Sequence, residues 1–325
     1  MAGTPRIIIN GALAYDDSFL YAGRIKEHLP AERDAPFYLN LRAPGPERSL
    51  GGCGGNVAYT LSLLKARVGV HSWVGKDGAE YLERLRGLGV DVGGVFVADD
   101  VFTSRAVLLA DAAGDQILFF GEPPRPVRLA VPDLRPYALA IVTAGIPAYS
   151  LEFLAACRKS RLSFILDPGK FIMDVEPGAL REAITGADTL VFNEYEYHLL
   201  LDRLGMTADA LESRVSSIVV TRGSDGMHVI TGGSRQSFGP IVLGEVFDPN
   251  GAGDAFLAGY SFGRYNGFSP SWSARMGATA ASFVLEVSGA QNHSFSPEAF
   301  HERLARAYGE PEKAITVQLA DPGRA

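Results

Sequence analysis

Short apolar, β-branched runs alternate with helical segments along most of this chain, and this alternation constrains the fold more than any other feature. Each run is apolar nearly throughout, which is typical of strands buried on both faces of a parallel sheet. The sequence therefore predicts an α/β fold with a doubly wound, mostly parallel sheet flanked by helices. The expected strands are Arg6–Asn10, Gly69–Val74, Leu139–Thr143, Ser163–Leu166, Thr189–Phe192 and Ser217–Thr221, and the expected helices between them are Asn56–Lys65, Ala79–Leu88, Ser150–Lys159, Gly178–Ile184 and Glu194–Leu204.

The pattern changes after Thr221. Gly226–Thr231 and Arg235–Phe238 flank Gly232-Gly233, a turn pair that predicts a β-hairpin. The rest of the chain is expected to hold three helices, Gly253–Tyr265, Pro270–Glu286 and Pro297–Tyr308. The last two begin with proline after a serine cap.

Two stretches do not fit the wound sheet. Asp17–Ser49 is long and rich in proline, and Asp91–Arg128 carries short alternating runs separated by Ala113-Gly114-Asp115. Together they predict a small β-structured lid over the strand ends, without a core of its own. We expect a large α/β domain that binds nucleotide and acceptor over residues 1–16, 50–92 and 129–315, a lid over residues 17–49 and 93–128, and a C-terminal tail over residues 316–325.

The charge and the cysteines exclude several classes of protein. Thirty basic and 37 acidic residues give a formal net charge of −7, whereas a general binder of phosphate backbones needs a basic face. Cys53 and Cys157 lack CxxC spacing, as expected for reduced thiols. No signal peptide is recognisable, and no apolar run approaches the roughly 18 residues of a membrane span. We therefore expect a cytoplasmic protein with no nucleic-acid or membrane partner.

Glycine is over-represented, with 37 residues against roughly 23 at average usage. The densest cluster is Gly51-Gly52-Cys53-Gly54-Gly55-Asn56, directly before an expected helix. Glycines in this place allow the backbone to approach a ligand closely, and they also act as hinges. A flexible turn without a ligand is the alternative interpretation.

The second cluster is Asp248-Pro249-Asn250-Gly251-Ala252-Gly253-Asp254, which opens another expected helix. Backbone N–H groups at such a helix start form an anion site that the helix dipole reinforces. A carboxylate beside an anion site is useful mainly as a proton acceptor for an attacking hydroxyl, although Asp254 could merely stabilise the first helical turn. The cluster is neither a Walker A loop nor a dinucleotide-binding fingerprint, since the latter should follow the first strand.

With both clusters in this order, roughly 200 residues apart, the sequence resembles the ribokinase-like (PfkB) family of carbohydrate and nucleoside kinases over nearly its whole length. Four further segments are similar to the family's motifs. They are Val74-Gly75-Lys76-Asp77-Gly78, then Leu88-Gly89-Val90-Asp91, then the N-x-x-E motif Asn193-Glu194-Tyr195-Glu196, and the T-x-G-x-x-G loop Thr221-Arg222-Gly223-Ser224-Asp225-Gly226.

For phosphoryl transfer, the resemblance implies that Asp254 accepts the proton of the acceptor hydroxyl. Gly251, Ala252 and Gly253 would form the hole that stabilises charge on the transferring group. The family usually has threonine where Asn250 stands, and asparagine there can still hydrogen-bond.

For the nucleotide, the resemblance implies ATP accompanied by Mg²⁺, which keeps some of its waters. Asp248 begins a loop beside which many members bind K⁺, so dependence on K⁺ is a further expectation. The residues expected along the path of ATP are Thr221, Gly223 and Gly226, and those expected to organise Mg²⁺ are Asn193 and Glu196, the latter through water.

For the acceptor, the resemblance implies that Asp16 grips hydroxyl groups, the alternative being an exposed loop carboxylate. Gly52, Gly55 and Asn56 would contact the acceptor, with the glycines also serving as a lid hinge. Eight glycines of these motifs are thus expected where backbone meets a ligand or flexes over one: Gly51, Gly52, Gly54, Gly55, Gly223, Gly226, Gly251 and Gly253.

The start of the chain, with a long segment between Asp16 and Asn40, is more similar to prokaryotic adenosine and nucleoside kinases than to sugar kinases. Phe120 matches an aromatic that stacks on the base there, although Phe119 and Phe120 could instead form lid core. Ala106 stands where those kinases can place a second aromatic, which leaves room for another nucleoside or a sugar. Asn40 stands where they place a small polar contact to the ribose.

The sequence thus favours an ATP-dependent kinase that phosphorylates a primary hydroxyl of a nucleoside, adenosine or a related purine nucleoside. The alternative is a sugar kinase of the same family, acting on ribose, fructose or a sugar acid. A catalytically silent sensor with the same fold is a third hypothesis, and the intact Asp254 argues against it. By analogy with some relatives, the lid strands could also pair across a homodimer.

Overall fold

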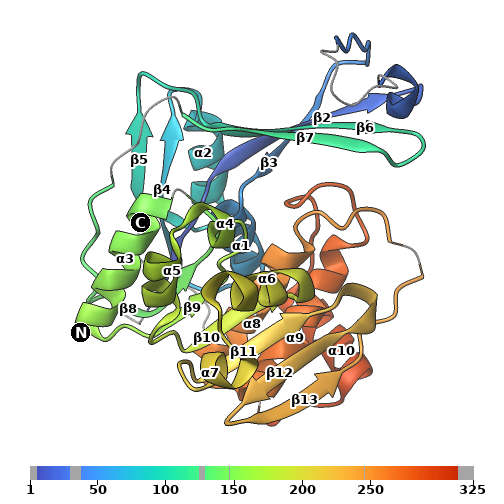
Figure 1. Ribbon diagram of the computed structural model, residues 1–325. Coiled ribbons are helices and arrows are strands. Elements are labelled where there is room, and N and C mark those ends of the chain that lie inside the picture. Colours follow the sequence, from blue (N-terminus) through green and yellow to red (C-terminus); the bar gives the residue numbers. More distant parts are fainter. Residues whose placement is uncertain (1–5, 30–37, 124–128, 146, 245, 314–325) are drawn as a thin grey trace.

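A nine-stranded sheet and a separate four-stranded sheet organise the protein (Figure 1). The computed structural model describes residues 6–29, 38–123, 129–145, 147–244 and 246–313. In spatial order, the large sheet consists of β13 (Ser234–Phe238), β12 (Met227–Thr231), β11 (Ser217–Thr221), β10 (Thr189–Asn193), β9 (Phe164–Leu166), β8 (Tyr137–Val142), β1 (Arg6–Asn10), β4 (Val68–Gly75) and β5 (Asp91–Ala98).

Neighbouring strands of the large sheet are parallel except in the β11–β12 and β12–β13 pairs. The predicted parallel sheet and the Gly232-Gly233 hairpin are therefore confirmed. Strand β1 lies inside the sheet between β8 and β4, parallel to both, with later strands added on either side. In such a doubly wound sheet the connections diverge at this point, and a crevice opens beyond the carboxyl ends of the strands.

Helices cover both faces of the sheet, which requires strands that are apolar on both sides. In β1, Ile7 and Ile9 point into one buried core, whereas Ile8 points into the other. The helices are α1 (Cys53–Leu63), α2 (Ala79–Gly87), α3 (Pro147–Ser160), α4 (Phe171–Asp174), α5 (Pro177–Ile184), α6 (Glu194–Leu204), α7 (Ala208–Glu212), α8 (Ala252–Tyr265), α9 (Pro270–Val284) and α10 (Pro297–Tyr308). Along the described ranges, no helix is both long and apolar enough to cross a membrane.

The small sheet lies at the top of the view in Figure 1 and corresponds to the predicted lid. Its order is β3 (Glu47–Gly51), β2 (Ala14–Tyr21), β6 (Ser104–Asp111) and β7 (Gln116–Gly121). The β6–β7 turn is held by Asp111, whose Oδ1 accepts hydrogen bonds from the backbone N–H groups of Ala113 and Asp115.

The two sheets divide the chain differently from the expected boundaries. The expected boundary at residue 93 falls inside β5, which pairs in parallel with β4 at the edge of the large sheet. An edge strand alternates between covered and exposed side chains, so its pattern resembles that of a lid strand. At the other boundary, residues 14–16 and 50–51 belong to lid strands, since Ala14 pairs with Gly51. The tail proposed for residues 316–325 lies outside the described residues.

Helices α8 and α9 approach each other closely because glycines lie at their contact. Gly259 and Gly263 are four residues apart and therefore lie on one face of α8. A Cβ added at Gly259 would lie 2.5 Å from the carbonyl oxygen of Met276, and one added at Gly263 would lie 2.8 Å from the Cα of Ser273. Helix α8 carries the second glycine cluster at its start, so this packing also fixes the position of that cluster.

We expect Gly259→Ala to lower the free energy of unfolding by about 1–3 kcal/mol, because the added methyl group overpacks the α8–α9 contact. Gly178→Ala, in α5 where nothing lies within 4 Å of an added Cβ, should leave stability unchanged or raise it slightly. Urea unfolding followed by circular dichroism measures both. Equal midpoints for the two variants would contradict the proposed packing constraint.

Candidate active site

A cavity of about 780 Å³ lies between the lid and the carboxyl ends of the large sheet's strands. Its lining includes residues that follow or end β1, β8, β9, β10 and β11: Ala12, Thr143, Asp167, Asn193 and Thr221. The volume falls in the range of small-molecule sites in proteins. The cavity is thus located at the topological switch point, where open α/β sheets bind their ligands.

The lid contributes residues from all four of its strands to the cavity, and on β2 these are the alternate residues Ala14, Asp16 and Ser18. On β7 the side chains of Gln116, Leu118 and Phe120 line the cavity, together with Gly121 at the strand end, whereas Phe119 is absent from the lining and is 62% exposed. This follows from the strand period of two. Of the two phenylalanines, Phe120 is therefore the one that faces the cavity.

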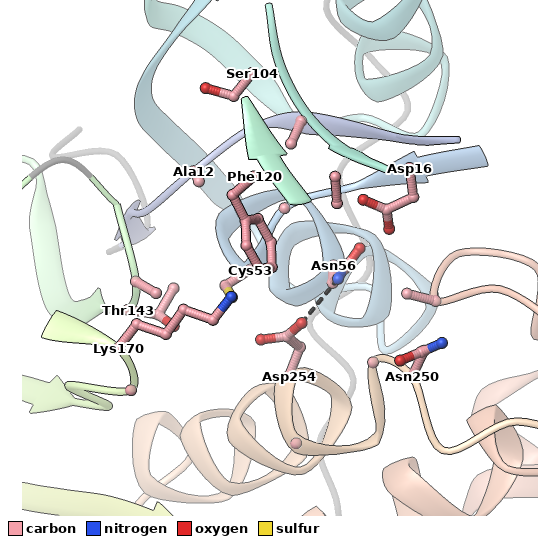
Figure 2. Close-up of a pocket in the computed structure, with 18 of the residues that line it drawn as sticks. Ala12, Asp16, Cys53, Asn56, Ser104, Phe120, Thr143, Lys170, Asn250 and Asp254 are labelled. Atoms are coloured by element: carbon pink, nitrogen blue, oxygen red, sulfur yellow. Dashed lines mark hydrogen bonds between the residues drawn. The ribbon is translucent and has the colours of Figure 1, made fainter. Parts of the chain in front are cut away.

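A single row across the lid holds two of the predicted acceptor residues, Asp16 and Phe120. Asp16 of β2 pairs with Ala106 of β6, and Ala106 pairs with Phe120 of β7. All three residues line the cavity. Ala106, which has a small side chain, lies between the carboxylate of Asp16 and the ring of Phe120 in this row. Figure 2 shows the Asp16 and Phe120 side chains.

The large domain adds aromatic side chains that the sequence reasoning missed. Trp73 of β4 and Tyr149 of α3 both line the cavity and are each 3% exposed. They belong to a small buried cluster beside β4 and β5. Sequence patterns assign such residues to the core, so only the tertiary structure identifies them as part of the cavity wall.

Helix α8 begins at the cavity with Gly251 as its N-cap, in the left-handed conformation with φ of 80°. An added Cβ at Gly251 would also lie 2.5 Å from the Cβ of Ala290. Gly251 and Gly253 line the cavity, and within the described part of the chain their N–H groups have no hydrogen-bond acceptor. Free N–H groups at a helix start attract an anion.

Ala252 differs from its neighbours in this loop. Its N–H donates to the carbonyl oxygen of Pro249 at 3.2 Å, and the residue is absent from the cavity lining. The predicted anion hole therefore reduces to the amides of Gly251 and Gly253.

Asp254 lies in the first turn of α8 and faces the cavity (Figure 2). Its Oδ2 accepts a hydrogen bond of 2.8 Å from the Asn56 side-chain amide of α1, and the Cys53 thiol also hydrogen-bonds to this carboxylate. Burial raises the pKa of Asp254 to about 6, an effect that the hydrogen bonds oppose and that Asp16 and Glu196 strengthen. A carboxylate with this pKa is suited to general-base catalysis near neutral pH.

Further carboxylates converge on the same cavity. Burial raises the pKa of Asp167 well above its usual range, and the negative charges of Glu196 and Asp254 raise it further. Glu196 forms a capping box with Asn193: its carboxylate accepts from the Asn193 N–H, and the Asn193 side chain accepts from the Glu196 N–H. Burial also raises the pKa of Asp16 to about 6, with Asp17 and Asp248 adding to the effect.

This accumulation of negative charge fits a cation that arrives with a polyphosphate. Within the described ranges, no three His, Cys, Asp or Glu side chains come close enough together to form a metal site. A Mg²⁺ ion bound here would therefore need water or phosphate oxygens among its ligands, which is its usual preference. Both oxygens of Asp248, the residue predicted beside K⁺, accept backbone N–H groups, from Asn250 and Gly289.

Three positively charged side chains line the cavity. Two of them are neutralised, since Arg48 pairs with Asp17, and Arg105 pairs with both Asp17 and Asp77. The third, Lys170, follows β9 and has its Nζ 2.9 Å from the centroid of the Phe120 ring. No carboxylate among the described residues forms an ion pair with Lys170, so its charge is available to a ligand.

Most of the predicted site residues come together in this cavity, but five do not line it. Asn40 is exposed on a loop beside the lid. Gly55 packs on the hydroxyl of Tyr81, where an added Cβ would collide, and Gly226 packs in the same way on the carbonyl oxygen of Phe238. The five residues are Asn40, Gly55, Gly223, Gly226 and Ala252.

The missed residues lacked a signal that a single sequence carries. Lys170 belongs to no spacing motif, although its place directly after the buried strand Phe164–Leu166 and Asp167 could have suggested a strand-end position. Thr143 follows β8 in the same way. Cys53 lies inside the first glycine cluster, and its contact with Asp254 joins segments about 200 residues apart.

Comparison with known proteins agrees with this geometry. The family model described as "pfkB family carbohydrate kinase" matches residues 27–298. A nucleoside kinase of Methanocaldococcus jannaschii is 27% identical over 272 residues, which cover 82% of this chain and 89% of that protein. The structure of Burkholderia thailandensis nucleoside kinase in complex with inosine is 26% identical, with a TM-score of 0.83 and coverage of 95% of this chain and 100% of that one. Its complex with ADP-inosine gives a TM-score of 0.81 at 26% identity, with coverage of 97% and 100%.

Proposed function

We propose that this chain, which belongs to the pfkB family of carbohydrate kinases, transfers the γ-phosphoryl group of ATP to a primary hydroxyl of a nucleoside. The relatives named above support a nucleoside as the acceptor. The observation that carries the assignment is the lid row Asp16–Ala106–Phe120, opposite Asp254. Adjacent strands are about 4.8 Å apart, so the row separates a hydroxyl-binding carboxylate from a stacking ring by roughly 10 Å, with space between them.

A neutral acceptor agrees with the charges of the cavity. Arg48 and Arg105 are occupied by Asp17 and Asp77, so neither is free to bind the carboxylate of a sugar acid. Lys170 has no ion-pair partner among the described residues and its Nζ lies over the Phe120 ring; we assign its charge to the phosphoryl group that is transferred. The aromatic side chains Trp73, Tyr149 and Phe120 add apolar surface that suits a base better than a sugar alone.

In the proposed reaction, the acceptor hydroxyl attacks the γ-phosphorus atom and its proton passes to the carboxylate of Asp254. The bond from the γ-phosphorus to the bridging oxygen breaks, and ADP leaves with the electron pair. The N–H groups of Gly251 and Gly253 and the ammonium group of Lys170 stabilise charge on the transferring group. Mg²⁺ bound to ATP would neutralise its phosphates, with Asp167 and Glu196 holding the ion through water.

Release of ADP tests the acceptor. With ATP and Mg²⁺, we expect turnover with inosine, adenosine, guanosine or cytidine, and little with ribose, fructose or 2-keto-3-deoxygluconate, because only a nucleoside fills both ends of the lid row. Phe120→Ala should raise the KM for the nucleoside by about 10- to 100-fold, since stacking on an aromatic ring is worth roughly 1–3 kcal/mol per base.

Phe119→Ala is the matched control, because it removes the neighbouring ring outside the cavity. Its KM should equal that of the wild type. Turnover confined to free sugars would refute the nucleoside assignment in favour of a sugar kinase, and no turnover with any acceptor would favour a sensor.

The pH dependence tests Asp254. Because the pKa of this carboxyl is raised to about 6, kcat/KM should rise with pH through this value as the base loses its proton. Asp254→Asn should lower kcat by about 10²–10⁴, whereas Asp133→Asn, at an exposed carboxylate outside the cavity, should change nothing. Near-normal turnover of Asp254→Asn would exclude its role as base.

Lys170→Met should lower kcat by about 10- to 100-fold, because a charge-assisted contact to the transferring group is worth roughly 1.5–3 kcal/mol. Methionine keeps the apolar contact with Phe120, so the variant isolates the charge. Lys76→Met is the control, since Lys76 lies over the Phe102 ring at 4.1 Å and outside the cavity. If steady-state kinetics give both variants the same kcat as the wild type, Lys170 does not act on the phosphoryl group.

A further inference from the structure

A chain of buried side chains connects Asp254 to the hinge of the lid. Asn56 donates from Nδ2 to Asp254 Oδ2 at 2.8 Å. Gln291 donates from Nε2 to the Asn56 Oδ1 at 3.0 Å and to the Tyr81 hydroxyl at 2.7 Å. Tyr81 in turn donates to the carbonyl oxygen of Gly51 at 2.6 Å.

The direction of each bond follows from its neighbours. An ionised Asp254 can only accept, so the amide nitrogen of Asn56 must face it and the Asn56 oxygen must face away. That oxygen needs a donor, and the NH₂ group of Gln291 supplies it. The second N–H of Gln291 is used by Tyr81, whose own proton is committed to Gly51. Every donor along the chain is therefore oriented by the next residue.

Burial makes this orientation firm. Gln291 is 2% exposed, Tyr81 is 0% exposed and Asn56 is 6% exposed. The Oε1 of Gln291 has no hydrogen-bond partner among the described residues. An unpaired buried acceptor is unfavourable, and the amide nevertheless keeps the orientation that serves both Asn56 and Tyr81.

We propose that Gln291 and Tyr81 are positioning residues: they hold the Asn56 amide so that its donor faces Asp254, and they connect the catalytic base to the lid hinge. The inference rests on the proposed role of Asp254 as the base. Neither residue touches the substrate in this scheme. Both act through Asn56, and their effect is on the ionisation and direction of the Asp254 carboxylate.

The surrounding backbone supports this connection. Gly51 ends the lid strand β3, and Gly52 is the N-cap of α1 with φ of 81°. The missing side chain of Gly55 makes room for the Tyr81 hydroxyl. On the other side, Ala290, next to Gln291, packs on Gly251 at the start of α8. The lid hinge at Gly51, the proposed base Asp254 and the turn at Gly251 are thus all connected through these hydrogen-bonded side chains.

Asp254 also faces charged and titratable groups from other elements, which the test must hold constant. None of these groups is altered in the variants below. They are Asp16 on β2, Cys53 on α1, Asp167 after β9, Lys170 before α4 and Glu196 on α6.

The experiment compares Gln291→Leu and Tyr81→Phe with the wild type. Carboxyl carbons of ¹³C-labelled aspartate are titrated by NMR, and the signal that disappears in Asp254→Asn identifies Asp254. We expect Gln291→Leu to raise the pKa of Asp254 by about one unit, because the donor to its carboxylate is no longer held. The shift for Tyr81→Phe should have the same sign and be smaller.

The kinetic consequence has the same direction. On the acid side, kcat/KM of Gln291→Leu should fall about tenfold for a shift of one unit, and activity should recover as pH rises above the new pKa. A merely structural residue would lower activity equally at all pH values. Tyr260→Phe is the control. It removes a different buried tyrosine hydroxyl, on α8, that is hydrogen-bonded to Thr189 and Ser217, and it should leave the titration of Asp254 unchanged.

An unchanged Asp254 titration in Gln291→Leu would overturn the proposal. If that variant does not fold, an unchanged titration in Tyr81→Phe overturns it and a raised pKa supports it. The NMR readout needs no substrate. If the wild type phosphorylates no nucleoside, the proposed function fails while the titration still decides whether Gln291 and Tyr81 control Asp254.

Discussion

The constraint on which the site depends is the crowding of negative charge in a partly dehydrated cavity. Burial raises the pKa of Asp16, Asp167, Glu196 and Asp254, and repulsion adds to the effect for three of them. Such a cluster is unfavourable unless positive charge enters it. Among the described residues that line the cavity, Arg48 and Arg105 are paired with Asp17 and Asp77, which leaves the start of α8 and Lys170 as positive groups without an acidic partner. The remaining compensation therefore has to arrive with the ligand. A metal–triphosphate complex brings cation and phosphate together, which is why the same cavity can be acidic and still bind a nucleotide.

The glycine excess has a physical explanation that differs in part from the expected one. Gly251 is needed for its left-handed conformation and for the lack of space beside Ala290. Gly55 and Gly51 are needed for space, since added Cβ atoms would collide with the Tyr81 hydroxyl and the Asp16 carboxylate. These two glycines serve the site indirectly, by admitting the side chains of functional residues. Gly259 acts still less directly on the site, because it allows α9 to pack closely against α8 and hold that helix in place.

Much of the fold and the glycine-rich turn at the start of α8 could be predicted because they are encoded by adjacent residues. A buried parallel strand is an apolar run, and a helix start that binds anions is a glycine cluster, so β1, β11 and the turn at Gly251 are recognisable from adjacent residues. Trp73, Lys170 and Gln291 are not, because their roles depend on which strand ends and loops meet in three dimensions. Strand β5 was misassigned for the same reason: its half-exposed pattern fits a lid strand or a sheet edge, and only its pairing with β4 decides.

Lid strand β3 and Asp254 are connected by hydrogen bonds, although they lie about 200 residues apart in the sequence. Strand β3, at the edge of the lid, ends at Gly51. The Gly51 carbonyl accepts the last hydrogen bond of the series that runs from Asp254 through Asn56, Gln291 and Tyr81. A lid movement that displaced Gly51 would break the hydrogen bond from the Tyr81 hydroxyl. The Tyr81 hydroxyl, then the Gln291 amide and finally the Asn56 amide would become free to reorient. The base would then lose a stabilising hydrogen bond and become easier to protonate. An open lid would thus leave more of Asp254 protonated, and unable to accept a proton, at the stage when water can reach the phosphoryl group. A closed lid would restore the ionised carboxylate when the acceptor hydroxyl is the only nucleophile within reach.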